Sequence, residues 1–191
     1  MNPAFSHKQY VLKRQSIALT GKFRFYDPAG NLVLFSEQKM FKLREDIRVY
    51  ADESKNHEVL IIKARSIIDF SAAYDVIDAA SGQKVGALRR KGLKSILRDE
   101  WEVLDVNDSV VGLLFEDNMT LALLRRLVVG WLLPQNYDLT FGEQRLADFK
   151  QRFNPFRYEL DIDLTMNDGR LDPRLALAAG ILLAAIEGRQ E

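Results

Sequence analysis

The sequence predicts a mainly β protein: a closed antiparallel β-barrel of about twelve strands that encloses a hydrophobic C-terminal helix, with one amphipathic helix on its surface. Three observations predict it. Short segments alternate apolar and polar residues between turn-forming residues, one hairpin pattern recurs, and the last helical segment is apolar on every side. A sheet of about a dozen strands tends to close or to split. We find no linker, so residues 1–191 are assigned to one domain.

The expected strands are short and are separated by turn-forming residues. They lie at residues 10–15, 17–26, 32–36, 40–43, 47–51, 59–64, 74–78, 85–88, 101–105, 111–114, 137–141, 145–149 and 158–166. In the second of them, Phe23 and Phe25 share one face while Lys22 and Arg24 share the other. The Asp-Pro-Ala-Gly-Asn sequence at 27–31 favours a turn, so a hairpin is expected there.

One hairpin pattern occurs twice in clear form, at residues 74–88 and 101–114. Each copy reads aromatic-x-Val-x-Asp, then a tight turn, then Val-Gly-x-Leu, and weaker copies begin at Phe23 and Tyr137. Repetition of one unit predicts consecutive hairpins of a single antiparallel sheet. The glycine after valine indicates a β-bulge or a close approach of two backbones, which helps a sheet to curl.

Residues 118–133 interrupt the strand pattern. Apolar residues recur there at helical spacing, and Arg125 and Arg126 lie on another face. Asn118 is a suitable N-cap and Pro134 ends the segment. We predict an amphipathic helix on the outside of the sheet.

The C-terminal helix is expected over residues 172–187. Asp172 is a good N-cap, Pro173 suits the first helical position, and residues 175–186 carry no polar side chain. A helix of about 16 residues is about 24 Å long, close to the roughly 20 Å of a strand of six or seven residues. The helix therefore fits along a barrel axis, whereas a bilayer span needs about 20 apolar residues.

Composition excludes several classes of function. The formal net charge is zero, so no global field draws the chain to nucleic acid, and no nucleic-acid partner is expected. The chain has no cysteine, which removes disulfides, thiolate nucleophiles and sulfur ligands. Residues 1–15 lack an apolar signal segment. We expect a cytoplasmic protein without a transmembrane span, in solution or peripherally attached to a membrane.

With these elements in place, the chain resembles the tubby C-terminal-like superfamily, which includes phospholipid scramblases and plant LURP-one-related proteins. The resemblance rests on the hairpin pattern at 74–88 and 101–114, the basic stretch before Trp101 and the terminal helix. It implies a barrel around a hydrophobic helix. The chain lacks the proline-rich arm and cysteine cluster expected of scramblases and the cysteine-containing motif of tubby proteins. It is more similar to the short single-domain members.

A basic stretch lies between the two clear hairpins. It consists of Arg89, Arg90, Lys91, Lys94 and Arg98. The resemblance to tubby-type domains implies a rim patch that binds lipid phosphates, and clustered cations near an anionic membrane favour such binding. The alternative is a solvated strand face neutralised by Asp99 and Glu100. The sequence leaves both open.

Other candidate chemistry is weaker. Asp161 and Asp163 raise the possibility of calcium, but they alternate onto an exposed strand face, and solvated carboxylates are the better interpretation. His7 and His57 show no metal-ligand spacing, and no nucleophile elbow or phosphate loop occurs.

We therefore expect a non-enzymatic binding module without metal or cofactor. Its partner is either anionic phospholipid or a protein, the latter docking at Arg125 and Arg126 or in an open groove.

Overall fold

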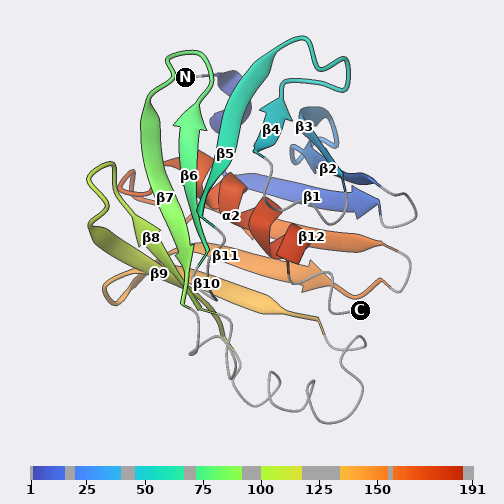
Figure 1. The fold of residues 1–191 in the computed structure, drawn as a ribbon. Helices are drawn as coiled ribbons and strands as arrows, with labels where there is room; N and C mark the ends of the chain where they lie inside the picture. The colour runs from blue at the N-terminus through green and yellow to red at the C-terminus, as the bar shows by residue number, and fades with distance from the viewer. Residues whose placement is uncertain are drawn as a thin grey trace.

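A computed structural model of the chain describes residues 2–15, 20–39, 46–66, 72–91, 100–117, 134–154 and 157–186. Within this part, twelve strands form one closed barrel in which all neighbours pair antiparallel, and β1 pairs with β12 to close it (Figure 1). The strands are β1 Gln9–Gln15, β2 Thr20–Tyr26, β3 Leu32–Lys39, β4 Ile47–Tyr50, β5 Glu58–Ser66, β6 Ala73–Asp78, β7 Lys84–Arg90, β8 Glu100–Leu104, β9 Val110–Glu116, β10 Asn136–Phe141, β11 Gln144–Arg152 and β12 Tyr158–Asp163. A short 3₁₀ turn, Pro3–Phe5, precedes them, and helix α2, Pro173–Ile186, follows. The predicted barrel is confirmed.

Five hairpins make up most of the barrel, and their turns lie at one end because every strand reverses direction. Each turn holds one residue in the left-handed region of φ. These residues are Gly30 (85°), Lys55 (60°), Gly82 (67°), Asp108 (66°) and Gly142 (60°). The first four follow one another at intervals of 25, 27 and 26 residues. The β4–β5 hairpin therefore belongs to the repeat as well, although the sequence pattern did not identify it.

The Val-Gly pair of the pattern forms a β-bulge with a close backbone approach, as predicted. In the β6–β7 hairpin, Val76 is opposite Gly86 but Ile77 is opposite Lys84, so Val85 is the extra residue. The β8–β9 hairpin repeats this shift around Gly112. A Cβ atom on Gly86 would lie 2.5 Å from the Leu104 carbonyl oxygen, so only glycine fits.

The aspartate of the pattern caps the turn that follows it. The Asp78 carboxylate accepts hydrogen bonds from the Ser81 backbone N–H (2.8 Å) and hydroxyl (2.9 Å). These two bonds lower the pKa of Asp78, and an ion pair with Arg174 lowers it further, against an opposing effect of burial. Asp105 accepts from two backbone N–H groups in the same way. The pattern is thus a local hairpin signal rather than a catalytic one.

Helix α2 occupies the barrel interior, as predicted, and runs between the strands in Figure 1. Its side chains from Leu175 to Ala185 are at most 5% exposed. They pack against the inward-facing residues of the strands, such as Leu12 and Ile162. Gly180 of the helix faces β12, because a Cβ added to it would lie 2.7 Å from the Ile162 Cδ1 atom. Small residues therefore let the helix fit inside.

Two arginines hold the ends of α2, and the sequence did not single out either contact. Asp172 caps the first turn by accepting from the Arg174 N–H (2.9 Å), as expected. The Arg174 guanidinium also reaches Asp78 (Nη1–Oδ2, 2.7 Å), which ties the helix start to the β6–β7 turn. At the other end, Arg14 is 5% exposed and donates from Nη1 to the Ala184 carbonyl (2.6 Å). A cation at this end also complements the helix dipole.

Several predictions fall on residues that the structure does not describe. The predicted surface helix at 118–133, with Arg125 and Arg126, lies outside the described residues, and so does the predicted strand at 40–43. Across the described ranges, no helix has the length and hydropathy needed to cross a membrane.

Candidate functional site

The basic stretch begins at the end of β7, on the rim opposite the hairpin turns. Arg89 lies on the outer surface, with its side chain 41% exposed. Arg90 is in register with Trp101, which is buried in the core, so these two side chains share the inner face. Lys91 lies within 3.8 Å of Glu102, the residue that also contacts Arg89, so Lys91 and Arg89 are outward neighbours. Lys94 and Arg98 lie outside the described residues.

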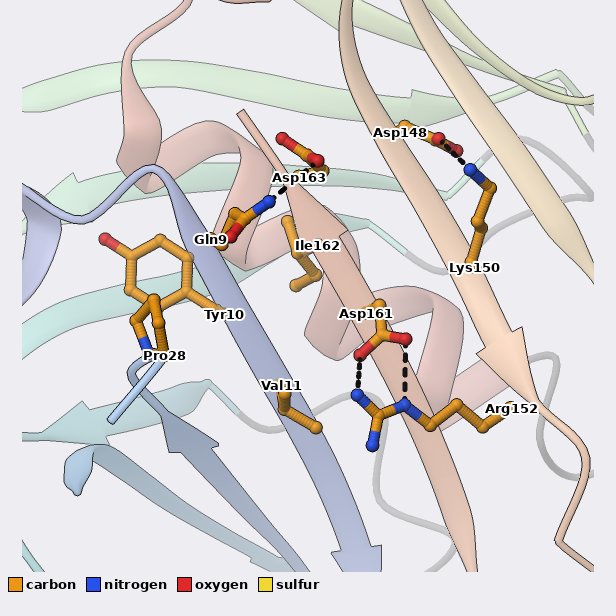
Figure 2. A pocket seen from close by; sticks show the side chains of 10 residues that line it. All are labelled: Gln9, Tyr10, Val11, Pro28, Asp148, Lys150, Arg152, Asp161, Ile162 and Asp163. Carbon is orange, nitrogen blue, oxygen red and sulfur yellow. Dashed lines mark hydrogen bonds and ion pairs between the residues drawn. The ribbon is translucent and has the colours of Figure 1, made fainter. Parts of the chain in front are cut away.

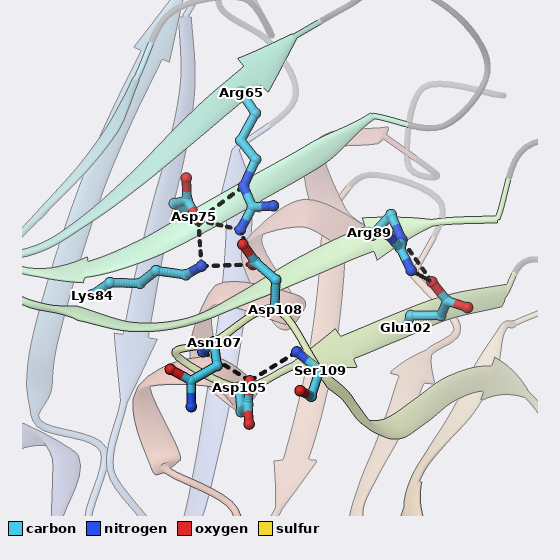
Figure 3. A network of polar contacts seen from close by, with 9 residues as sticks. All are labelled: Arg65, Asp75, Lys84, Arg89, Glu102, Asp105, Asn107, Asp108 and Ser109. Atoms are coloured by element: carbon cyan, nitrogen blue, oxygen red, sulfur yellow. Dashed lines mark hydrogen bonds and ion pairs between the residues drawn. The ribbon is translucent and has the colours of Figure 1, made fainter.

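Two glutamates on β8 face these cations. Arg89 is directly opposite Glu102 in the strand register, and its Nε atom donates to Glu102 Oε2 at 2.6 Å (Figure 3). The Lys91 Nζ atom lies 2.5 Å from Glu100 Oε1. Glu100 was expected to neutralise the stretch, whereas Glu102 was not considered. Ion pairs at an exposed surface each stabilise a fold by less than about 1 kcal/mol, so another anion can compete for these cations.

A second charged cluster lies on the outer face, where the β8–β9 turn meets side chains of β5, β6 and β7. The β8–β9 turn brings Asp108 to the Lys84 Nζ atom (2.6 Å) and to the Arg65 guanidinium (Figure 3). Arg65 also contacts Asp75 (2.6 Å). Lys84 and then Arg65 lower the pKa of Asp108. Two cations and two carboxylates cancel, so this cluster connects strands and offers no net charge to a ligand.

A groove lies across the outer surface of β1, β12 and β11 (Figure 2). Its volume is about 430 Å³, and its lining residues are Gln9, Tyr10, Val11, Pro28, Asp148, Lys150, Arg152, Asp161, Ile162 and Asp163. Lys150 pairs with Asp148 (2.7 Å) and Arg152 with Asp161 (2.7 Å). Three aspartates against one lysine and one arginine leave the lining one net negative charge.

Asp161 and Asp163 face outward from β12, as the alternation predicted. Burial raises the pKa of Asp163, but hydrogen bonds from Thr165 and Gln9 outweigh it, so the pKa lies below its usual value. These carboxylates line a groove, which sequence reasoning missed. No local signal marks it, because Gln9 and its hydrogen-bond partner Asp163 are 154 residues apart. In the described ranges, no three His, Asp or Glu side chains gather closely enough to hold a metal ion.

Comparison with known proteins identifies a family over most of the barrel. The family model described as LURP-one-related matches residues 32–184, which extends from β3 to near the end of α2. No curated protein and no solved structure matched the chain.

Proposed function

Because the chain belongs to the LURP-one-related family, part of the tubby-like C-terminal superfamily, we propose that it is a non-enzymatic barrel module that binds anionic phospholipid headgroups through residues 89–98. One observation carries the proposal: Arg89 and Lys91 lie side by side on the outer surface at the end of a strand. A rim position lets both side chains approach a flat bilayer surface together. The filled interior leaves the outer surface as the place to meet a ligand.

The charge of the segment sets the strength expected of this binding. Residues 89–102 contain five basic and three acidic side chains, a net charge of +2. Each net positive charge near an anionic surface contributes about 1 kcal/mol, so binding to anionic vesicles should exceed binding to neutral vesicles by about 30-fold. Added salt should weaken it, since charges at a surface are screened within about 10 Å at 0.1 M.

Co-sedimentation with vesicles tests the proposal. Phosphatidylcholine vesicles with and without about 30% phosphatidic acid are compared for the wild type and for the double variant Arg89→Glu/Lys91→Glu. The matched control is Arg48→Glu/Lys63→Glu, which reverses two outward charges elsewhere on the barrel. We expect the rim variant to lose binding to anionic vesicles and the control to keep it. Equal recovery on neutral and anionic vesicles would refute the proposal.

The groove supports a second candidate, a protein-interaction module. Its net negative lining, with Val11 and Pro28 at one side, complements an extended basic segment of a partner protein. Reversing Asp161 to Lys should weaken capture of such a partner, while Arg89→Glu should leave it unchanged. A partner that binds both variants as it binds the wild type would rule out the groove.

A further inference from the structure

We propose that Glu100 and Glu102 are built-in counter-ions that make the rim prefer phosphate monoesters over headgroups with a single negative charge. The inference rests on the proposed function of residues 89–98 and adds the residues that determine its specificity. It differs from a general basic patch, which would bind any anionic surface.

The strand register puts the counter-ions in place before any ligand arrives. Glu102 is opposite Arg89 and reaches both Arg89 (2.6 Å from Nε) and Lys91 (3.8 Å). Glu100 reaches Lys91 at 2.5 Å. The glutamate side chains are 17% and 22% exposed, less than the 41% of Arg89. Lys91, at 25%, is little more exposed than Glu100, so Arg89 is the most accessible of these four side chains.

A ligand must compete with these carboxylates, and the outcome depends on its charge. A phosphodiester carries one negative charge, the same as a carboxylate, so exchanging one for the other brings no electrostatic gain. The carboxylate is also attached to the adjacent strand, and attached groups compete at effective concentrations of about millimolar or more. A monoanionic headgroup therefore has no advantage over Glu102.

A phosphate monoester does have an advantage. It carries about −1.5 to −2 charges near neutral pH and presents three acceptor oxygens. One such group can accept hydrogen bonds from a guanidinium and an ammonium at once, and hydrogen bonds between charged partners are the stronger ones. Arg89 and Lys91 are outward neighbours that supply this pair of donors. The rim thus discriminates by the charge on one phosphate rather than by total surface charge.

Vesicle binding of glutamine variants tests this inference. The wild type, Glu102→Gln and Glu100→Gln/Glu102→Gln are measured on phosphatidylcholine vesicles. These contain either phosphatidic acid, a monoester, or phosphatidylglycerol, a diester, matched for total charge. We expect the wild type to prefer phosphatidic acid by at least about fivefold. Each glutamine should raise binding to phosphatidylglycerol about fivefold and bring the ratio toward one.

The control variant is Glu58→Gln, which removes the carboxylate of another cross-strand pair, with Arg48, and should change neither value. Competition by soluble glycerol 3-phosphate separates a free phosphate ligand from a membrane-bound one. Displacement at low concentration assigns the site to soluble monoesters, and persistence of vesicle binding assigns it to lipid. Both outcomes support the inference when Glu102→Gln lowers the preference for monoesters.

Two outcomes overturn it, and they are distinguishable. A wild type that binds both anionic vesicles equally, with no effect of Glu102→Gln, refutes the counter-ion role and leaves the proposed function standing. Absence of binding to every anionic vesicle and to glycerol 3-phosphate, in wild type and variants alike, refutes the proposed function and the inference together. Circular dichroism confirms that each glutamine variant is folded.

Discussion

Gly86 offers the sharpest test of how the barrel is built, through the substitution Gly86→Ala. The added Cβ would lie 2.5 Å from the Leu104 carbonyl oxygen and 3.1 Å from both methyl carbons of Leu175. Carbon and oxygen atoms normally stay about 3.3 Å apart or more, so β7 and β8 must separate by nearly 1 Å or the bulge must change. Overpacking a core costs about 1–3 kcal/mol. The upper half of this range applies here because the Leu104 carbonyl belongs to the backbone and cannot rotate away as a side chain can. We expect a loss of about 2–3 kcal/mol, or roughly 4–12 °C in Tm for a domain of this size.

Urea denaturation and thermal melting, followed by circular dichroism, measure this loss. The matched control is Gly21→Ala, also within a strand, where the nearest atoms to the added Cβ are Phe23 ring carbons at 3.4 Å. The control should be neutral or slightly stabilising, by up to about 1 kcal/mol. Gly112→Ala should behave like Gly86→Ala, because its Cβ would lie 2.5 Å from the Thr140 carbonyl. If Gly86→Ala proves as stable as Gly21→Ala, the close approach does not dictate the bulge.

Three further substitutions test the interior, the helix end and the surface charge. Ile181→Asp buries an unpaired carboxylate at a cost of several kcal/mol, comparable with the whole stability of a domain, so we expect no folded soluble protein by circular dichroism. Arg14→Met removes the donor to the Ala184 carbonyl and should lower the free energy of unfolding, measured in urea, by about 2 kcal/mol; an unchanged value would show that this hydrogen bond does not hold the helix end. Partial burial, then two neighbouring aspartates, raise the pKa of Asp117, so the contribution of Asp117 to stability falls as pH rises from 3.8 through that pKa. Asp117→Asn should match the wild type near pH 3.5 and exceed it by a few tenths of a kcal/mol near pH 7; equal stability at both would refute this.

The barrel was predictable because its signals are local. A hairpin needs an aspartate that caps its turn, a residue that accepts positive φ and an alternating pattern, and all three lie within about 15 residues. Both strands of the β4–β5 hairpin were predicted, but its membership in the repeat was missed because its left-handed residue is Lys55 rather than Gly, Asn or Asp, in a longer turn. Its place in the repeat becomes visible only when the backbone angles are known.

The candidate sites were less predictable because they depend on register and on closure. The run Arg89-Arg90-Lys91 is plainly basic, but only the β7–β8 register shows that Arg90 lies on the inner face and that Glu102 pairs with Arg89. The groove needs β1 beside β12, a pairing of the two ends of the barrel. No local pattern encodes that neighbourhood.

Strand β7 contributes to core packing on its inner face and to the proposed binding site on its outer face. In β7, Gly86 packs against the helix and Arg89 faces outward, three residues further along. Glu102→Gln weakens only the surface ion pairs with Arg89 and Lys91, so it should change stability by about 1 kcal/mol or less while altering vesicle preference. Gly86→Ala should lower stability and leave binding per folded molecule unchanged. If the two changes add independently in the double variant, packing and recognition are separate properties of this barrel; a coupling would mean that the ligand also depends on how the helix is held inside.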